Sequence, residues 1–178
     1  YQIDNPDYSY TAEDVKRYFD DKDIDALVLI NPDNPSGNYI RKADLMGLVA
    51  WAEEKRIQII IDESFADFSD EMNNTLIEQE ILETHRNLYV MKSISKSYGV
   101  PGLRLGVLAS GDVDTIRAIK KDVSIWNINS FAEFYMQIAE KYKKQYEAGL
   151  EEFRKERIRL EEKLSAVSGL RVIPSPAN

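Results

Sequence analysis

Short apolar runs alternate along the chain with segments whose apolar residues recur every three or four positions. Four of the runs are rich in β-branched residues and predict strands at residues 26–30, 57–62, 87–92 and 105–109. Between the first two, Leu45, Leu48, Val49 and Ala52 fall on one face and predict a helix of about three turns. Strands that alternate with helices are typical of a largely parallel α/β sheet.

Three further segments follow from the same pattern. A helix is predicted to begin near Thr11, which can cap it together with Asp14 three residues later. Residues 131–164 predict one long amphipathic helix, in which Gly149 is the expected bend because glycine costs ~1 kcal/mol inside a helix. Residues 169–178, GLRVIPSPAN, predict the first strand of a further unit, so we expect a piece of a longer protein.

Composition narrows the classes of protein that the chain can represent. At 178 residues, 43% of them apolar, it has the size of one domain with a real core. No apolar run approaches the ~20 residues of a membrane span, so a cytoplasmic location is expected. The net charge of −8 argues against a nucleic-acid or anionic-membrane partner. Without cysteine, and with His85 as the single histidine, thiolate sites, histidine zinc sites and a Ser-His-Asp triad are excluded within these residues.

Ligands of parallel sheets gather beyond the carboxyl ends of the strands, and a polar cluster follows each of the first three runs. The first cluster is NPDNPSG, residues 31–37. It is either an emphatic turn or a site in which a cis Asn-Pro bond aims the Asn34 amide into a cleft.

The second cluster is DESFADF, residues 62–68, in which Asp62 ends a very apolar run. A partly desolvated carboxylate needs a cation or strong donors, so Asp62 must have a partner. The structural alternatives are a helix cap or a salt bridge to a neighbouring loop. Glu63 and Asp67 are predicted to be exposed.

The third cluster is SISKSYGVPGLRLG, residues 93–106. Ser93, Ser95 and Arg104 can hold a phosphate, and the Lys96 amine can form a Schiff base and then move protons. Taken alone, this segment also fits an ordinary turn.

Together and in this order, the three clusters resemble the pyridoxal-phosphate (PLP) enzymes of the class I/II aminotransferase family, which have the fold-type I architecture. The resemblance implies a three-layer α-β-α arrangement with a mainly parallel sheet. Residues 1–145 would be part of the PLP-binding large domain, and residues 146–178 the interdomain helix and the start of the small domain. DESFADF and WNINSFAE (126–133) resemble the histidinol-phosphate aminotransferase and threonine-phosphate decarboxylase branch.

The resemblance also assigns roles to individual residues. Lys96 would carry the cofactor as a Schiff base, and Asp62 would pair with the pyridine nitrogen. Asn34 would donate to the ring 3-oxygen, while Ser93, Ser95 and Arg104 would hold the phosphate. Phe65 stands where many aminotransferases have a tyrosine that also donates to the 3-oxygen. Trp126 and Asn129 are expected to be packing and helix-entry residues.

The leading functional hypothesis is amino-group transfer between an amino acid and a 2-oxo acid, through Lys96 and PLP. The alternatives are decarboxylation of a phosphorylated amino acid and a PLP-binding domain of a transcriptional regulator. Phe65 slightly favours the decarboxylase over the aminotransferase. The implied partners are the small-molecule substrates and, at full length, a second copy in a homodimer. The resemblance places the Gly-rich phosphate loop, the ring-stacking aromatic and the substrate-carboxylate arginine outside this chain.

Overall fold

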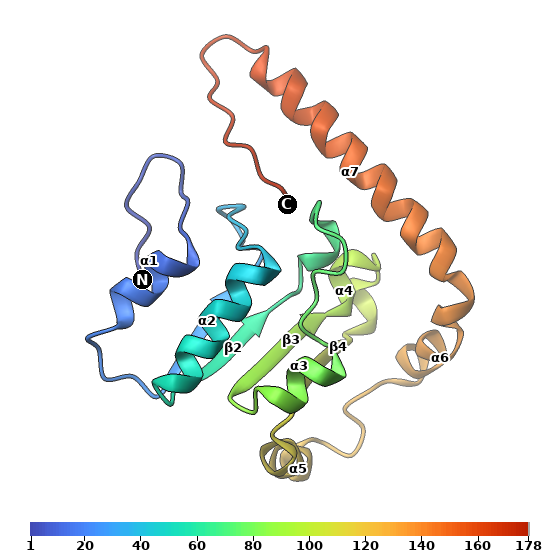
Figure 1. Ribbon diagram of the computed structural model, residues 1–178. Coiled ribbons are helices and arrows are strands. Elements are labelled where there is room, and N and C mark those ends of the chain that lie inside the picture. The colour runs from blue at the N-terminus through green and yellow to red at the C-terminus, as the bar shows by residue number, and fades with distance from the viewer. Residues whose placement is uncertain (178) are drawn as a thin grey trace.

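A computed structural model describes residues 1–177 of the chain. Its centre is a four-stranded sheet whose strands lie in chain order: β1 (Ala26–Ile30), β2 (Gln58–Asp62), β3 (Leu88–Ser93) and β4 (Gly106–Ser110) (Figure 1). The first three strands are parallel, and β4 runs antiparallel to β3. The predicted mainly parallel sheet is therefore confirmed, with one reversed edge strand. The connection from β3 to β4, which contains α4 (Ile94–Ser97) and η2 (Pro101–Leu103), turns directly back onto the sheet.

The core lies on one face of the sheet, between the strands and the first two helices. Alternate residues of β1, β2 and β3 are at most 7% exposed; they are Leu27, Leu29, Ile59, Ile61, Leu88 and Val90. They pack in one cluster with Leu45, Leu48, Val49 and Ala52 of α2 (Lys42–Glu54), which confirms the predicted helix face. At α1 (Ala12–Phe19), Thr11 and Asp14 form the predicted capping box.

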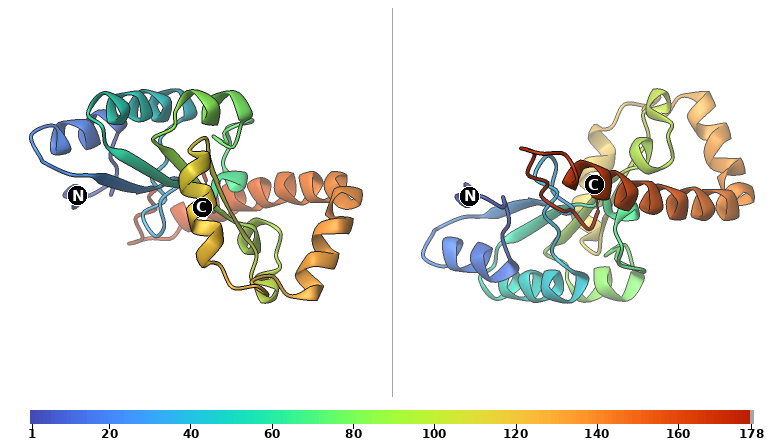
Figure 2. Two further views of the ribbon diagram at one scale, coloured as in Figure 1. Left: turned by 90° about the horizontal axis from the view of Figure 1, so that it is seen from below. Right: turned by 90° about the horizontal axis from the view of Figure 1, so that it is seen from above.

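Helices lie on both sides of the sheet, as the α-β-α prediction requires. In Figure 2, α1, α2 and α3 (Gln79–Thr84) lie on one side, and α5 (Val113–Asp122) and α6 (Ser130–Ala139) lie on the other. The second layer does not reach β1, where Val28 of that face is 62% exposed.

The predicted single helix over residues 131–164 is two helices. α6 ends at Ala139, a 3-10 turn η3 covers Glu140–Tyr142, and α7 runs from Lys143 to Ser165. The predicted break at Gly149 is wrong, because Gly149 lies inside α7 and the change of direction occurs at η3. α7 forms the outer edge of the molecule (Figure 1). No helix among residues 1–177 is both long and apolar enough to cross a membrane.

The strand predicted near the C-terminus does not form within the described residues, and Asn178 lies outside them. Residues 171–177 instead fold back toward the turn that follows β2. Pro176 O accepts a hydrogen bond from Asp70 N at 2.9 Å, and Ala177 O accepts one from Arg157 Nη1 at 2.7 Å. Backbone groups that a strand would use are thus satisfied by a turn and by α7. The division into residues 1–145 and 146–178 falls within the first turn of α7 and stays a prediction.

Candidate active site

The carboxyl ends of β1, β2 and β3 bring the three polar clusters to one edge of the sheet. Ile30 pairs with Asp62, and Asp62 pairs with Met91 on the next strand. The strands remain joined just beyond their ends, since Asn31 N donates to Asp62 O at 2.9 Å and Glu63 N donates to Met91 O at 2.7 Å. The carboxyl ends of the strands, where the sequence predicts the site, therefore lie side by side at one edge of the sheet.

The first cluster forms a tight turn and leaves the Asn34 side chain exposed. Both Asn-Pro bonds are cis. Asn31 is buried, and its amide holds the loop by donating to Ile40 O at 2.9 Å and accepting from Ile40 N at 2.8 Å. Asn34 is exposed at the tip of this loop. Asn31 is therefore the structural member of the pair, a division of roles that the sequence did not reveal.

Asp62 finds its partner two residues away, in Ser64. The Ser64 backbone N–H and hydroxyl both donate to Asp62 Oδ1, at 2.8 and 2.5 Å. Ser64 Oγ in turn accepts from Ser93 N at 2.9 Å, so a continuous chain of hydrogen bonds joins Asp62 to the end of β3. Both predicted structural alternatives, a helix cap and a salt bridge, are wrong. Among residues 1–177, Asp62 Oδ2 has no hydrogen-bond partner, which leaves one carboxylate oxygen able to accept from a ligand N–H.

Lys96 lies beside the ring of Phe65. It belongs to the single turn of α4, its side chain is exposed, and its Nζ lies 5.8 Å from the Phe65 ring centroid. No carboxylate of the described chain forms an ion pair with it. The amine thus stands at the sheet edge against an aromatic face.

Ser95 and Arg104 meet the backbone of the same segment. Ser95 is buried, and its hydroxyl lies 3.5 Å from Leu105 O, to which Ile94 N also donates at 3.2 Å. Arg104 is exposed, has a left-handed backbone with φ 56°, and donates to Pro101 O at 3.3 Å. The structure therefore brings Asp62, Phe65, Ser93 and Lys96 to one edge. Ser95 lies beside Lys96 in α4, and Arg104 lies on the return of the same loop.

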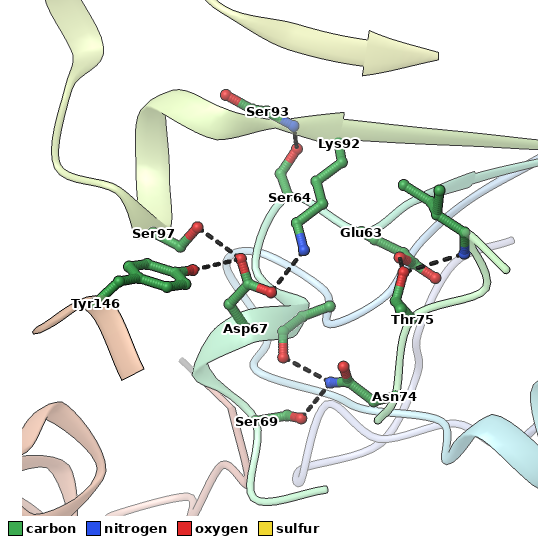
Figure 3. Close-up of polar contacts among 12 residues, drawn as sticks. Glu63, Ser64, Asp67, Ser69, Asn74, Thr75, Lys92, Ser93, Ser97 and Tyr146 are labelled. Atoms are coloured by element: carbon green, nitrogen blue, oxygen red, sulfur yellow. Dashed lines mark hydrogen bonds and ion pairs between the residues drawn. The ribbon is translucent and has the colours of Figure 1, made fainter. Parts of the chain in front are cut away.

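Asp67, predicted to be exposed, is instead the centre of a hydrogen-bond network (Figure 3). Its carboxylate accepts from Lys92 Nζ at 2.5 Å, from Ser97 Oγ at 2.7 Å and from Tyr146 Oη at 2.7 Å. Burial by itself would raise the pKa of Asp67, but the ammonium of Lys92 and the three donated hydrogen bonds bring that pKa below its ordinary value. The carboxylate connects β3, α4 and α7.

Glu63 is also buried, contrary to the prediction, with 1% of its surface exposed. Its carboxylate accepts from Thr75 Oγ1 at 2.7 Å and from Leu76 N at 2.6 Å, which fixes the loop that leads to α3 (Figure 3). Burial raises the pKa of this carboxyl. Glu63 is a structural anchor beside the site.

α7 holds the turn that contains these acids. Arg154 Nε donates to Ser69 O at 2.8 Å, Arg157 Nη1 donates to Phe68 O at 2.9 Å, and the Phe68 and Phe153 ring centroids are 4.5 Å apart. The turn includes the 3-10 segment η1 (Ala66–Phe68). The long helix is therefore attached to the segment that carries Phe65 and Asp67.

Of the residues around 126–133, the structure confirms one prediction and corrects the other. Asn129 caps α6, since its side chain accepts from Ala132 N at 3.0 Å. Trp126 is 90% exposed in the described structure, so the expected packing role is wrong.

The residue set fits a PLP-type cofactor: a lysine amine without a carboxylate partner, an aspartate with one oxygen available, and serine and arginine donors near by. A family model for aminotransferase class I and II matches residues 1–178. The chain belongs to this family, whose cofactor is pyridoxal 5'-phosphate, as the resemblance implied.

Similar proteins refine this placement. The chain is 34% identical to the L-serine phosphate decarboxylase of Sulfurospirillum multivorans over 97% of its own length and 44% of that protein. It is also 34% identical to the CMP-5'-(3-aminopropyl)phosphonate synthase of Streptomyces rubellomurinus, over 100% of this chain and 28% of that protein. A solved structure of a decarboxylase from Sulfurospirillum multivorans superposes with a TM-score of 0.86 at 32% identity, covering 100% of this chain and 51% of the other.

Both branches suggested by the motifs occur among the relatives. A histidinol-phosphate aminotransferase of Ruminiclostridium cellulolyticum is 28% identical over 98% of the chain and 46% of that protein. A threonine-phosphate decarboxylase of Salmonella typhimurium is 28% identical over 88% of the chain and 42% of that protein. The chain spans about half or less of the length of these relatives.

Proposed function

We propose that the chain is the lysine-bearing part of a PLP-dependent decarboxylase that acts on an amino acid carrying a phosphate or phosphonate group. The observation that carries this proposal is Phe65 beside Lys96, at 5.8 Å from amine to ring centroid, where many aminotransferases have a tyrosine. The similarity to two proteins named for a phosphate-bearing amino acid and an aminoalkylphosphonate supports the substrate class.

The chain's own residues would divide the work as follows. Bound PLP supplies an electron-accepting ring. Lys96 binds the cofactor through its amine and, once released, holds and delivers a proton at the substrate's α-carbon. Asp62 Oδ2 accepts the pyridine N–H, while Ser64 fixes Oδ1 so that the free oxygen keeps its direction. Asn34 donates to the ring 3-oxygen, and Ser93, Ser95 and Arg104 bind the phosphate.

The Phe65 ring is the side chain beside the Lys96 amine. Its ring offers no hydroxyl to the ring 3-oxygen, so Asn34 is left as the side-chain donor that we assign to that atom. The ring also presents an apolar face beside the Lys96 amine, at 5.8 Å from amine to ring centroid. These properties suit a reaction that ends with protonation of the α-carbon.

The test uses the protein at its natural length, loaded with PLP. L-serine phosphate and L-threonine phosphate are supplied with and without 2-oxoglutarate, and CO₂ and oxo-acid products are measured together. We expect CO₂ release that needs no oxo acid and is lost in Lys96→Ala. Oxo-acid formation that depends on 2-oxoglutarate, without CO₂, would contradict decarboxylation.

Amino-group transfer to a 2-oxo acid is the second candidate, supported by the similarity to histidinol-phosphate aminotransferase. Histidinol phosphate carries no carboxylate to lose, so turnover of that compound with 2-oxoglutarate would favour transfer. The regulator alternative has no feature in residues 1–177 that favours it. The homodimer and the cytoplasmic location stay predictions.

A further inference from the structure

Two lysines at the end of β3 present their amines to the same short turn. Lys92 is the last but one residue of β3, and Lys96 follows four residues later in α4. Lys92 Nζ lies 2.5 Å from Asp67 Oδ1, and Lys96 Nζ lies 5.8 Å from the ring centroid of Phe65, two residues before Asp67. The amines of both lysines therefore lie against residues 65–67.

The two amines differ in their partners. The Lys92 side chain is 16% exposed and that of Asp67 is 17% exposed, so their ion pair is largely shielded from water. Lys96 is exposed, and no carboxylate among residues 1–177 pairs with it.

We propose that Asp67 selects the reactive lysine, by holding the Lys92 amine in a shielded ion pair so that an aldehyde condenses with Lys96. In the condensation the nitrogen lone pair attacks the carbonyl carbon, the carbon–nitrogen double bond forms, and the oxygen leaves as water. A lysine ammonium held by a carboxylate 2.5 Å away must leave that ion pair and give up a proton before its nitrogen can attack, so Lys92 is withdrawn from the reaction. This inference rests on the proposed function.

The surroundings of Asp67 keep it ionised for this task. Ser97 and Tyr146 donate neutral hydroxyl hydrogen bonds to it, and the pKa of Asp67 lies below its ordinary value. Glu63 also faces Lys92, but its own carboxylate is occupied by Thr75 and Leu76. Asp67 is therefore the group that contacts the Lys92 ammonium directly, and it acts as a positioning residue rather than as a participant in the chemistry.

The experiment maps the lysine that PLP modifies. The natural-length protein is incubated with PLP and reduced with borohydride, which delivers hydride to the carbon–nitrogen double bond and makes the attachment permanent. Peptide masses then locate the label. We expect Lys96 alone in the wild type, neither lysine in Lys96→Ala, and Lys92 in the double variant Lys96→Ala, Asp67→Asn. Lys92 labelling should rise about tenfold to a hundredfold, the factor expected when a hydrogen bond to a charged group is lost.

Asp70→Asn is the matched control, because Asp70 lies in the same turn but pairs with Arg157. In the Lys96→Ala background it should leave Lys92 unlabelled. A role of Asp67 in folding alone would lower labelling generally and would not move it to Lys92.

A second measurement covers the case in which Asp67→Asn does not fold. In Lys96→Ala, PLP labelling of Lys92 is compared with that of exposed Lys144, which has no ion pair among the described residues, and Lys92 should take up at least about tenfold less label. Equal labelling of Lys92 and Lys144, or no transfer of label in a folded double variant, would overturn the inference. Absence of label on wild-type Lys96 would instead overturn the proposed function, so the two failures are distinguishable.

Discussion

Tyr98 and Tyr146 stack with ring centroids 4.0 Å apart and planes inclined by 8°. Tyr98 directly follows α4, which carries Lys96, and Tyr146 lies in the first turn of α7. The Tyr146 hydroxyl also donates to Asp67 at 2.7 Å, so one side chain touches both the lysine's segment and the acid beside it. The position of α7 is thereby coupled to the site.

Replacing Tyr146 with phenylalanine separates these two contacts. The ring stack can remain, while the hydrogen bond to an ionised carboxylate is lost. We expect Tyr146→Phe to lower the free energy of unfolding by about 1–2 kcal/mol in urea titrations. Tyr142→Phe, at a 56% exposed tyrosine on the neighbouring turn, is the control and should change it by less than about 0.5 kcal/mol. Equal losses in the two variants would contradict the role given to the hydroxyl.

Phe65→Tyr tests the environment of the Lys96 amine. If the new hydroxyl donates to the cofactor's 3-oxygen, it stabilises the form of the Schiff base that has lost its proton. The pKa of the Lys96 Schiff base should therefore be lower in Phe65→Tyr than in the wild type, as followed by titrating the visible spectrum. Phe68→Tyr is the control, because the Phe68 ring packs on Phe153. Identical titrations of wild type and Phe65→Tyr would show that position 65 does not reach the 3-oxygen.

The elements that the sequence predicted well are those defined by local periodicity. The strands and the α2 face depend on residues close together, and each was recovered nearly to its bounds. The direction of β4 and the break at Glu140–Tyr142 depend on how distant segments pack. Gly149 illustrates the limit, because a propensity of about 1 kcal/mol did not outweigh the rest of an α7 that continues on both sides of it.

In the candidate site, too, some residues can be predicted from local sequence and others depend on distant packing. Asp62 and Lys96 could be predicted because they lie at or just beyond the ends of apolar strands. Ser64 could also have been predicted, because aspartate side chains commonly accept a hydrogen bond from the backbone N–H two residues later. The Asp67 network could not be found in this way. Its partner Tyr146 is 79 residues away, and nothing in the sequence distinguishes it from Tyr135 or Tyr142.

Glu63 gives a pH dependence of stability. Its pKa is raised by burial above the ordinary 4.5, so the folded protein binds this proton more readily than the unfolded chain does. The contribution of Glu63 to stability should fall as the pH rises from about 4.5 through the folded pKa. In Glu63→Gln that slope is removed, so the difference in unfolding free energy, variant minus wild type, should increase with pH. A difference that stays constant or decreases between pH 4 and pH 8, measured by urea unfolding, would contradict it.

Gly149 provides a stability test that leaves the site untouched. It is exposed within α7, and a Cβ placed there would meet no atom within 4 Å. Gly149→Ala should therefore raise the free energy of unfolding by roughly 1 kcal/mol, because alanine restricts the unfolded chain and suits a helix interior. Gly169→Ala is the contrasting variant, since Gly169 is equally open but has φ +81°, a left-handed backbone that costs alanine about 1 kcal/mol. Thermal unfolding of the two should thus shift in opposite directions. A loss of stability in Gly149→Ala would mean that α7 is not a continuous helix at that residue.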